Sequence, residues 1–260
     1  MKPPSLVVLK TPAEVAQMRR AGRVAAEALR EVSRAAAPGV TTGALDRLAE
    51  TVIRDHGGVP SFKGYRGYPA SICTSIDDEV VHGIPGPRAL REGEILSIDL
   101  GVRLGGFHAD VAVTVPVGEV PPEVHRLIAT TRAALDAGVA AARPGATLGD
   151  VSWAIQSLVE AAGFSVVRDF AGHGVGRALH EDPQVPNVGH PGTGPTLRVG
   201  MTLAVEPMVN MGGPDVVMDD DGWTVRTRDH SLSAHAEHTV AITAAGPEVL
   251  TGLEGTSAVY

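Results

Sequence analysis

The sequence predicts an α+β fold of two similar halves, in which helix pairs cover a shared antiparallel sheet. Three observations lead to this prediction. A Pro-Gly-x-Thr-x-Gly motif occurs at Pro38 and returns 106 residues later at Pro144. Helical patterns lie on both sides of each copy, and strand-like stretches follow each helix pair. A duplicated unit explains all three features, and a chance recurrence of the motif in a helix-rich chain is the alternative.

Two helices open the first half. Residues 11–14, Thr-Pro-Ala-Glu, form a capping-box pattern with proline at the first helical position, and apolar residues follow at helical spacing. Pro38-Gly39 ends this helix. A second helix is predicted over residues 44–55, with Gly57-Gly58 as its stop, because apolar residues gather on one face. These residues are Leu45, Leu48, Val52 and Ile53.

The second half repeats this arrangement. A helix is predicted over residues 121–142, ahead of the second motif copy. Beyond that copy, Val151, Leu158, Val159 and Gly163 align with Leu45, Val52, Ile53 and Gly57 of the first half. We therefore expect one catalytic domain, residues 1–260, with an internal repeat over roughly residues 11–117 and 121–245.

The predicted strands cover residues 95–102, 109–117, 201–209 and 237–243. If the turn between the first two centres on Leu104 and Gly105, then Asp99 faces Asp110 directly across a hairpin. Opposed carboxylates destabilise a sheet unless one carboxyl keeps a proton or a cation binds between them. A shifted register that turns one aspartate to solvent is the alternative.

Three further ionisable residues lie in apolar or glycine-rich segments, at His173, Glu206 and Glu237. Ionisable groups seldom lie in apolar surroundings without a hydrogen-bond or ionic partner, although each of these residues alone could be a core residue with such a partner. With the two aspartates they supply four carboxylates and one imidazole. This set suits two divalent ions of the manganese, iron, cobalt or zinc kind.

Composition excludes several classes of function. The net charge is −8, from 22 basic and 30 acidic residues, and no lysine or arginine cluster forms a phosphate-binding stripe, which disfavours direct nucleic-acid binding. A single cysteine, Cys73, rules out an intrachain disulfide and a multi-cysteine zinc finger and fits the cytoplasm. The first ten residues hold only a short apolar run, so we expect neither secretion nor membrane insertion.

Eight separated motifs now identify a family. They are Gly64-Tyr65-Arg66-Gly67-Tyr68-Pro69, Val81-His82-Gly83-Ile84-Pro85, Ser97-Ile98-Asp99, Phe107-His108-Ala109-Asp110, Gly172-His173-Gly174-Val175-Gly176, His180-Glu181-Asp182-Pro183, Val205-Glu206-Pro207-Met208 and Glu237-His238-Thr239. With these motifs the chain resembles the type I methionine aminopeptidases of peptidase family M24, over nearly its whole length. The resemblance implies the pita-bread fold.

The resemblance also implies roles for the metal ligands. Asp99 would chelate one ion, Asp110 and Glu237 would bridge both, and His173 and Glu206 would complete the other. A hydroxide shared by two ions would attack the peptide bond after an initiator methionine. The two ions are cobalt, manganese, iron or zinc, and the ligands do not separate these metals.

Three residues would act on the substrate, and others would bind it. Glu206 is our candidate for moving the proton to the leaving amine, with His180 stabilising the oxyanion and His82 contacting the substrate near the scissile bond. The resemblance assigns the methionine pocket to Tyr65, Tyr68, Cys73, Leu179 and Trp223. A small second residue would be preferred.

The chain departs from the family pattern at Leu179, Asp77 and His235, where many relatives have an aromatic residue, asparagine and glutamine. Because of these departures, the resemblance does not determine the shape of the methionine pocket or the fine properties of the metal centre. The type II branch of the family carries an insertion between the segments that match His173 and Glu206. These two residues are only 33 positions apart here, which favours type I. No zinc-binding extension precedes Thr11, so we expect the short bacterial form.

The expected partners are nascent polypeptide N-termini, for a monomeric enzyme with at most transient ribosome contact, no membrane and no nucleic acid. Two alternatives remain: an Xaa-Pro aminopeptidase or prolidase-like peptidase of the same fold, and a binding homologue that has lost catalysis.

Overall fold

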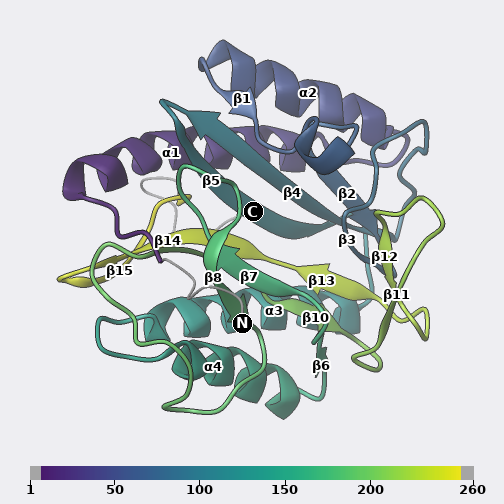
Figure 1. Ribbon diagram of the computed structural model, residues 1–260. Helices are drawn as coiled ribbons and strands as arrows, with labels where there is room; N and C mark the ends of the chain where they lie inside the picture. The colour runs from purple at the N-terminus through teal and green to yellow at the C-terminus, as the bar shows by residue number, and fades with distance from the viewer. Residues whose placement is uncertain (1–6, 253–260) are drawn as a thin grey trace.

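Four helices cover a curved antiparallel sheet in the computed structural model, which describes residues 7–252. Helices α1 (Pro12–Ala35) and α2 (Thr42–Asp55) lie on the outside of one half, and α3 (Pro122–Ala141) and α4 (Leu148–Ala161) on the outside of the other (Figure 1). The predicted α+β class with two similar halves is confirmed. The boundaries proposed for the halves stay a prediction.

Threonine side chains cap three of the four helices, α1, α2 and α4, whereas α3 starts after Pro121 without a side-chain cap. Thr11 and Glu14 form the predicted capping box at α1. Thr41 caps α2, so this helix begins two residues before the predicted position. Thr147, its counterpart 106 residues later, caps α4 and forms a capping box with Asp150. These three helix starts are therefore fixed by local hydrogen bonds to backbone N–H groups that the helix itself leaves unpaired.

The main sheet has nine strands, all paired antiparallel, in the order β1-β4-β5-β14-β9-β7-β8, with β2 added on β4 and β15 on β14. The strands are β1 (Val59–Pro60), β2 (Cys73–Ile76), β4 (Ile95–Leu104), β5 (Phe107–Pro116), β7 (Ala171–Gly174), β8 (Glu181–Pro186), β9 (Thr202–Val205), β14 (Glu237–Thr243) and β15 (Gly246–Val249). The two halves meet where β5 pairs with β14.

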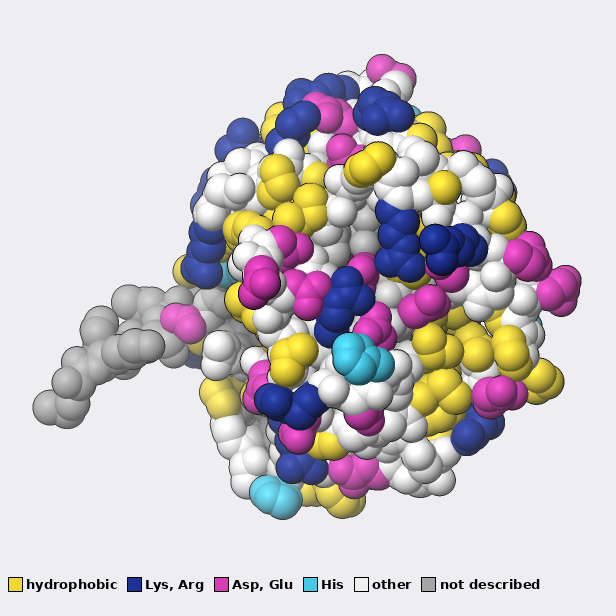
Figure 2. Space-filling view, turned by 90° about the vertical axis from the view of Figure 1, so that its right-hand side faces the viewer, with side chains coloured by type: hydrophobic (Ala, Val, Ile, Leu, Met, Phe, Trp, Pro, Cys, Tyr) yellow, Lys and Arg dark blue, Asp and Glu magenta, His cyan; other side chains and the backbone are white. Residues whose placement is uncertain are grey.

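Two small sheets complete the fold. One has the order β13-β10-β6 and the other β11-β12-β3. Their strands are β3 (Glu79–Val81), β6 (Ser165–Val166), β10 (Met208–Asn210), β11 (Val216–Met218), β12 (Val225–Thr227) and β13 (Ser233–His235). A short 3₁₀ turn, η1 (Tyr65–Gly67), follows β1. Figure 2 shows the face beside β11 and β12, where basic and acidic side chains are intermingled rather than separated into a basic stripe.

The predicted turn of the β4–β5 hairpin is wrong by one residue. Leu104 pairs with Phe107, so the turn residues are Gly105 and Gly106, both with positive φ. A two-residue turn of this handedness matches the twist of the strands and requires positive φ at both positions, which two glycines provide without strain. Asp99 is consequently opposite Ala112, and Asp110 is opposite Gly101.

The single strand predicted over residues 201–209 is also wrong. β9 ends at Val205 and β10 starts at Met208 in a different sheet, with Glu206-Pro207 between them. Proline has no N–H for a ladder hydrogen bond, so it ends the pairing in the main sheet. The break leaves the Glu206 side chain at the end of β9, beside the residues that β7 and β14 contribute.

Each helix pair packs on its own half of the sheet and encloses a separate core. One core joins α1 and α2 to β4 and β5, through residues such as Leu29, Ile53, Ile98 and Val111. The other joins α3 and α4 to β9 and β14. Because neighbouring residues of a strand point to opposite faces, the residues between these apolar ones lie on the face away from the helices. Within residues 7–252, no helix combines the length and apolarity that a bilayer crossing requires.

Candidate metal centre and pocket

Three carboxylates lie on one face of three adjacent strands. In β5, Ala112 is paired with Asp99 of β4 on one side and with Glu237 of β14 on the other. Residues paired across a sheet point to the same face, and so does Asp110, two positions before Ala112. Asp99, Asp110 and Glu237 therefore share the face opposite the helices. The predicted direct opposition of the two aspartates is wrong, but a two-residue shift of register preserves the face.

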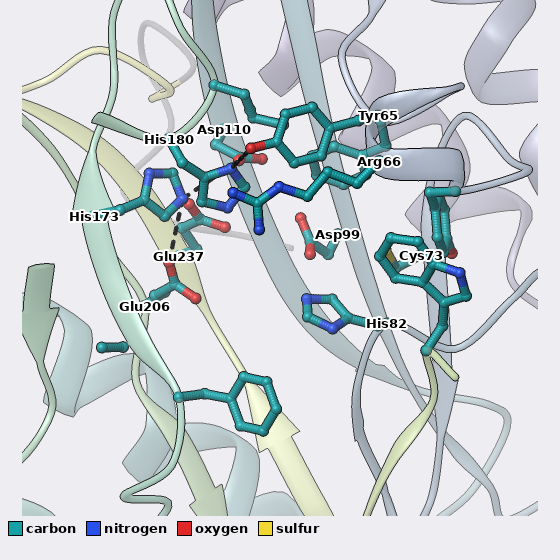
Figure 3. Close-up of a pocket in the computed structure, with 16 residues that line it drawn as sticks. Tyr65, Arg66, Cys73, His82, Asp99, Asp110, His173, His180, Glu206 and Glu237 are labelled. Carbon is teal, nitrogen blue, oxygen red and sulfur yellow. Dashed lines mark hydrogen bonds and ion pairs between the residues drawn. The ribbon is translucent and has the colours of Figure 1, made fainter. Parts of the chain in front are cut away.

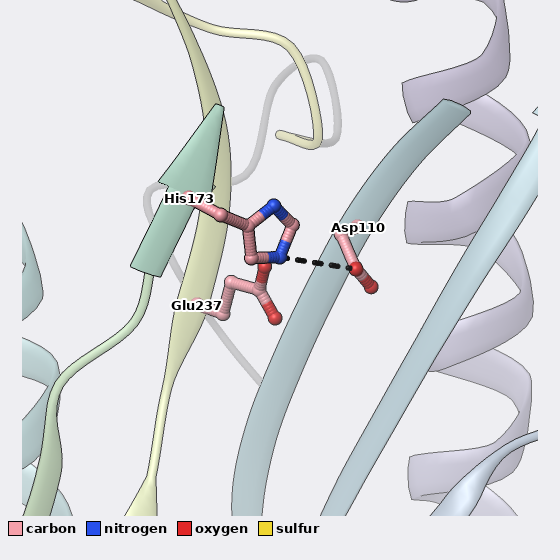
Figure 4. A group of neighbouring side chains, drawn as sticks. All are labelled: Asp110, His173 and Glu237. Atoms are coloured by element: carbon pink, nitrogen blue, oxygen red, sulfur yellow. Dashed lines mark ion pairs between the residues drawn. The ribbon is translucent and has the colours of Figure 1, made fainter. Parts of the chain in front are cut away.

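His173 brings an imidazole to the same face from β7. It pairs with Ala204 of β9, two residues before Glu206. Its Nε2 lies 3.6 Å from Oε1 of Glu206 and 3.9 Å from Oδ2 of Asp110 (Figures 3 and 4). Ligand atoms of Asp110, His173 and Glu237 all lie within 4.8 Å of one another. All five predicted ligands line one cavity.

Burial makes this cluster electrostatically unfavourable by itself. Burial raises the pKa of Asp110 to about 7. It also raises the pKa of Asp99 well above its ordinary range, and the nearby charge of Asp110 adds to the shift. The pKa values of Glu206 and Glu237 are raised by burial and by the other carboxylates. Burial lowers the pKa of His173, which favours the neutral imidazole that binds metal ions.

Several ligand atoms have no hydrogen-bond partner. Oδ1 of Asp99, Oδ1 of Asp110 and Oε1 of Glu237 are buried and have no hydrogen-bond partner among the described residues 7–252. Buried carboxylate oxygens without partners are costly unless a cation or a proton neutralises them. Nδ1 of His173 instead contacts the carbonyl oxygen of Gly174 at 2.8 Å, which orients the ring and leaves Nε2 toward the carboxylates. The donor set therefore fits divalent metal ions of the transition series.

An apolar pocket adjoins the carboxylates. The cavity has a volume of about 190 Å³, less than the ~300–1,000 Å³ of pockets for drug-sized ligands, so its size suits one amino-acid residue. The five residues predicted for the methionine pocket all line it: Tyr65, Tyr68, Cys73, Leu179 and Trp223. Tyr68, Cys73 and Leu179 are almost fully buried and pack together.

Two histidines line the same cavity outside the carboxylate cluster. The ring of His180 lies 4.1 Å from that of His173, measured between centroids, and its Nδ1 contacts the hydroxyl of Tyr65 at 2.9 Å. Desolvation, with His173 close by, lowers the pKa of His180 to about 3. His82 lies on the opposite wall with a positive φ of 63°, and burial lowers its pKa. A non-glycine residue held in this conformation is uncommon and is often found at functional sites.

Four lining residues were not predicted from the sequence. Phe62, Arg66, Phe170 and Ala171 also face the cavity. Phe62 and Arg66 belong to the loop that carries Tyr65. Phe170 directly precedes β7, the strand of His173, and Ala171 begins it, so proximity to recognised motifs could have indicated these residues.

The two other departures from the family pattern, Asp77 and His235, lie outside the cavity lining. Asp77 has a positive φ of 57°, and its Oδ1 accepts a hydrogen bond from the Ile95 N–H. Asparagine and aspartate both tolerate this conformation. His235 is buried, its Nε2 has no partner among residues 7–252, and burial lowers its pKa to about 3. Neither residue contributes a side-chain atom to the cavity lining.

Comparisons with known proteins agree with this geometry. Residues 16–244 match metallopeptidase family M24. A methionine aminopeptidase of Clostridium perfringens is 52% identical over 95% of this chain and 99% of its own length. Methionine aminopeptidase 1 of Bacillus subtilis is 48% identical over 95% of this chain and 99% of its own length.

Solved structures give the same picture. The crystal structure of methionine aminopeptidase from Rickettsia prowazekii superposes with a TM-score of 0.94 at 44% identity, over 95% of this chain and 100% of that one. Prolidase from Pyrococcus furiosus superposes at 0.76 with 20% identity, and the match covers 95% of this chain but 66% of that chain. The second likeness concerns the fold alone.

Proposed function

The chain belongs to metallopeptidase family M24, and from this membership we infer that it removes N-terminal methionine from proteins and peptides by hydrolysing the first peptide bond. The main support for this function is that one cavity combines two features. Buried carboxylates and an imidazole lie together in it, and beside them is an apolar pocket whose size suits one amino-acid residue. The full-length likeness to methionine aminopeptidases supports the same activity over the proline-directed alternative.

We propose that the cluster binds two divalent metal ions. Asp99 would hold one ion, Asp110 and Glu237 both, and His173 and Glu206 the other. The unpaired oxygens of Asp99, Asp110 and Glu237 support this arrangement, as does the formal balance between four carboxylates and two dications. Bound ions of this kind supply an acidified water and polarise a carbonyl group.

The apolar pocket would bind the methionine side chain. Tyr68, Cys73 and Leu179 form its buried end, and Trp223 packs edge-on against Tyr68 with ring centroids 5.0 Å apart. A flexible, polarisable thioether fits an irregular apolar pocket of this kind well. We propose that room beyond the scissile bond is limited, so that substrates with a small second residue are preferred.

The chain's own residues would manage charge and protons around the scissile bond. His180 would donate a hydrogen bond to the oxygen on which negative charge develops. His82, on the opposite wall, would contact the substrate around the departing residue. Glu206, at the end of β9, would pass the proton of the attacking water to the leaving amine. Such an enzyme would act on nascent chains in the cytoplasm as a monomer with at most transient ribosome contact.

The test is hydrolysis of Met-Ala-Ser by chelator-treated protein to which manganese, cobalt, iron or zinc is restored in turn. We expect turnover to return with at least one ion, and Asp110→Asn to bind less metal and to lack turnover. Asp136→Asn, an exposed carboxylate on α3, is the matched control and should behave as the wild type. Cleavage of an Ala-Pro peptide in place of Met-Ala-Ser, or no cleavage with any ion, would contradict the proposed function.

A further inference from the structure

Arg66 is the only lysine or arginine that lines the cavity, within the part of the chain that the structure describes. It lies in η1, in a loop bounded by Gly64 and Gly67. Its backbone is left-handed, with a φ of 49°, although it has a side chain. This conformation is unfavourable for residues with a Cβ and persists where the surroundings hold it. The loop therefore holds Arg66 in an uncommon conformation at the mouth of the site.

The guanidinium group of Arg66 has no protein acceptor. Among residues 7–252, it forms neither an ion pair nor a side-chain hydrogen bond, and its one side-chain contact of note is with the ring of Tyr65, 5.3 Å from Cζ to the centroid. Figure 3 shows the side chain extending to the ring of His180. Arg66 is solvent-exposed, so the five N–H donors of its guanidinium group can bind water. Its donors are free to bind a ligand that enters the cavity.

The charge of Arg66 is important because the formal charges of the other groups in the site add up to zero under the proposed function. Four carboxylates offset the charge of two divalent ions under the proposed function, and burial disfavours the charged form of His82. Arg66 then provides the remaining positive charge in the cavity lining. A ligand group that lies near it is favoured if it carries negative charge and disfavoured if it carries positive charge.

The position of Arg66 identifies the part of the substrate that it meets. Tyr65 and Tyr68, which line the methionine pocket, belong to the same short loop as Arg66. In an extended peptide, residues one and three project to the same side, ~6.5–7 Å apart. With the first side chain in the pocket, the third side chain extends along the wall that Arg66 occupies.

We propose that Arg66 binds the third residue of the substrate and makes the enzyme prefer a carboxylate at that position. This preference rests on the proposed function, because it concerns a peptide whose first residue occupies the pocket. Arg66 is thus a specificity residue for the downstream chain and takes no part in bond cleavage.

The test compares Met-Ala-Asp-Ala, Met-Ala-Asn-Ala and Met-Ala-Lys-Ala, all amidated at the C-terminus to remove the terminal carboxylate. For the wild type we expect kcat/KM to be about three- to ten-fold higher with aspartate than with lysine, the scale of a partly exposed charge pair. High salt should narrow this ratio, because screening weakens the pair.

Variants separate a charge effect from a packing effect. Arg66→Gln should bring the aspartate-to-lysine ratio close to one, and Arg66→Glu should invert it, whereas Arg66→Lys should retain a preference for aspartate. Arg20→Glu, an equal charge change on an exposed position of α1, should leave the ratio unchanged. If Arg66 only supported Tyr65, all three peptides would slow down together and the ratio would not move.

The outcomes distinguish the two proposals. Failure to cleave Met-Ala-Asn-Ala would contradict the proposed function itself. Cleavage of all three peptides at equal kcat/KM by the wild type, or an unchanged ratio in Arg66→Glu, would overturn the role of Arg66 and leave the proposed function intact.

Discussion

The hydroxyl of Tyr65 lies 2.9 Å from Nδ1 of His180, and the two rings stack with centroids 5.2 Å apart and an interplanar angle of 22°. Partial desolvation, with His173 close by, lowers the pKa of the solvent-exposed His180 to about 3, so the ring is neutral at ordinary pH. A neutral imidazole carries one proton, on Nδ1 or on Nε2. In the tautomer that accepts a hydrogen bond from the Tyr65 hydroxyl at Nδ1, the proton is on Nε2, and His180 can donate a hydrogen bond toward the substrate.

Tyr65→Phe should therefore lower kcat for Met-Ala-Ser by about three- to ten-fold, the effect of one lost orienting hydrogen bond. The ring stack survives this change, so KM and metal content should stay close to wild type. Steady-state kinetics with metal analysis measures both. An unchanged kcat would show that the hydroxyl does not orient His180.

The proton on Asp110 should stabilise the metal-free protein, and this contribution should be lost as pH rises from about 4 to 7. Burial raises the pKa of Asp110 from its ordinary value of 3.8 to about 7, so the folded state binds this proton more tightly than the unfolded chain. The stabilising effect of the bound proton is complete below pH 4 and is lost as pH rises through 7. Buried histidines such as His235 and His238, whose pKa values are lowered by burial, act in the opposite direction, so the comparison is with a variant that lacks the Asp110 proton. We expect the Tm of chelated wild type to fall by about 5 °C between pH 5 and 8 relative to that of chelated Asp110→Asn.

Asp110→Asn is the control for this pH effect, because it removes the titrating group at nearly constant shape. Thermal melts of the chelated variant should show a smaller fall over the same range. Addition of a divalent ion to the wild type should remove most of the loss. A parallel fall in both proteins would mean that other groups produce it.

Leu179→Ala should weaken methionine binding more than it slows the reaction. Leu179 is 3% exposed and packs with Tyr68 and Cys73 at the buried end of the pocket. Its truncation removes apolar contact that substrate and transition state share, worth about 1–2 kcal/mol, so KM should rise about five- to thirty-fold with kcat less affected. Val188→Ala, outside the cavity, is the control. A fall in kcat at constant KM would argue against a pocket role.

The two equivalent helix caps should contribute unequally to stability. Thr147 exchanges hydrogen bonds with Asp150 in a capping box, whereas Thr41 caps only the Ala44 N–H. Thr147→Ala should therefore lower the free energy of unfolding by about 1–2 kcal/mol and Thr41→Ala by about 0.5–1 kcal/mol. Urea unfolding of the metal-loaded proteins measures both values. Equal losses of unfolding free energy in the two variants would show that the capping box adds no stability beyond a single cap.

Much of the fold could be predicted because its signals are local. The caps at Thr11 and Thr147 and the glycines of the hairpin determine where elements begin and turn. Two predictions for the sheet were wrong, the turn between β4 and β5 and the single strand over residues 201–209. In both places the local sequence pattern does not determine how the strands pair. The turn could centre on either of two adjacent residue pairs, and the proline after Glu206 interrupts an apolar stretch that otherwise reads as one strand.

The donors of the candidate site, and seven further residues that line the cavity, could be predicted from the sequence, but Phe62, Arg66, Phe170 and Ala171 were not. Charged residues in apolar segments stand out in a sequence because their burial needs a neutralising partner. Phe170 and Arg66 give no such signal, since an aromatic or a surface arginine fits almost any loop. Their membership of the cavity depends on which loops the sheet brings together.

The four helices, the two similar halves and the five candidate donors could be predicted from the sequence alone, because hydrophobic period, capping and charge burial are properties of neighbouring residues. Only the tertiary structure decided that Asp99 and Glu237, 138 positions apart, flank the same residue, Ala112. Pairing of β5 with β14 joins the halves, and long-range strand register of this kind depends on the packing of both cores at once. The same packing gave Arg66 an open position beside the site, where none of residues 7–252 supplies an acceptor for its side chain.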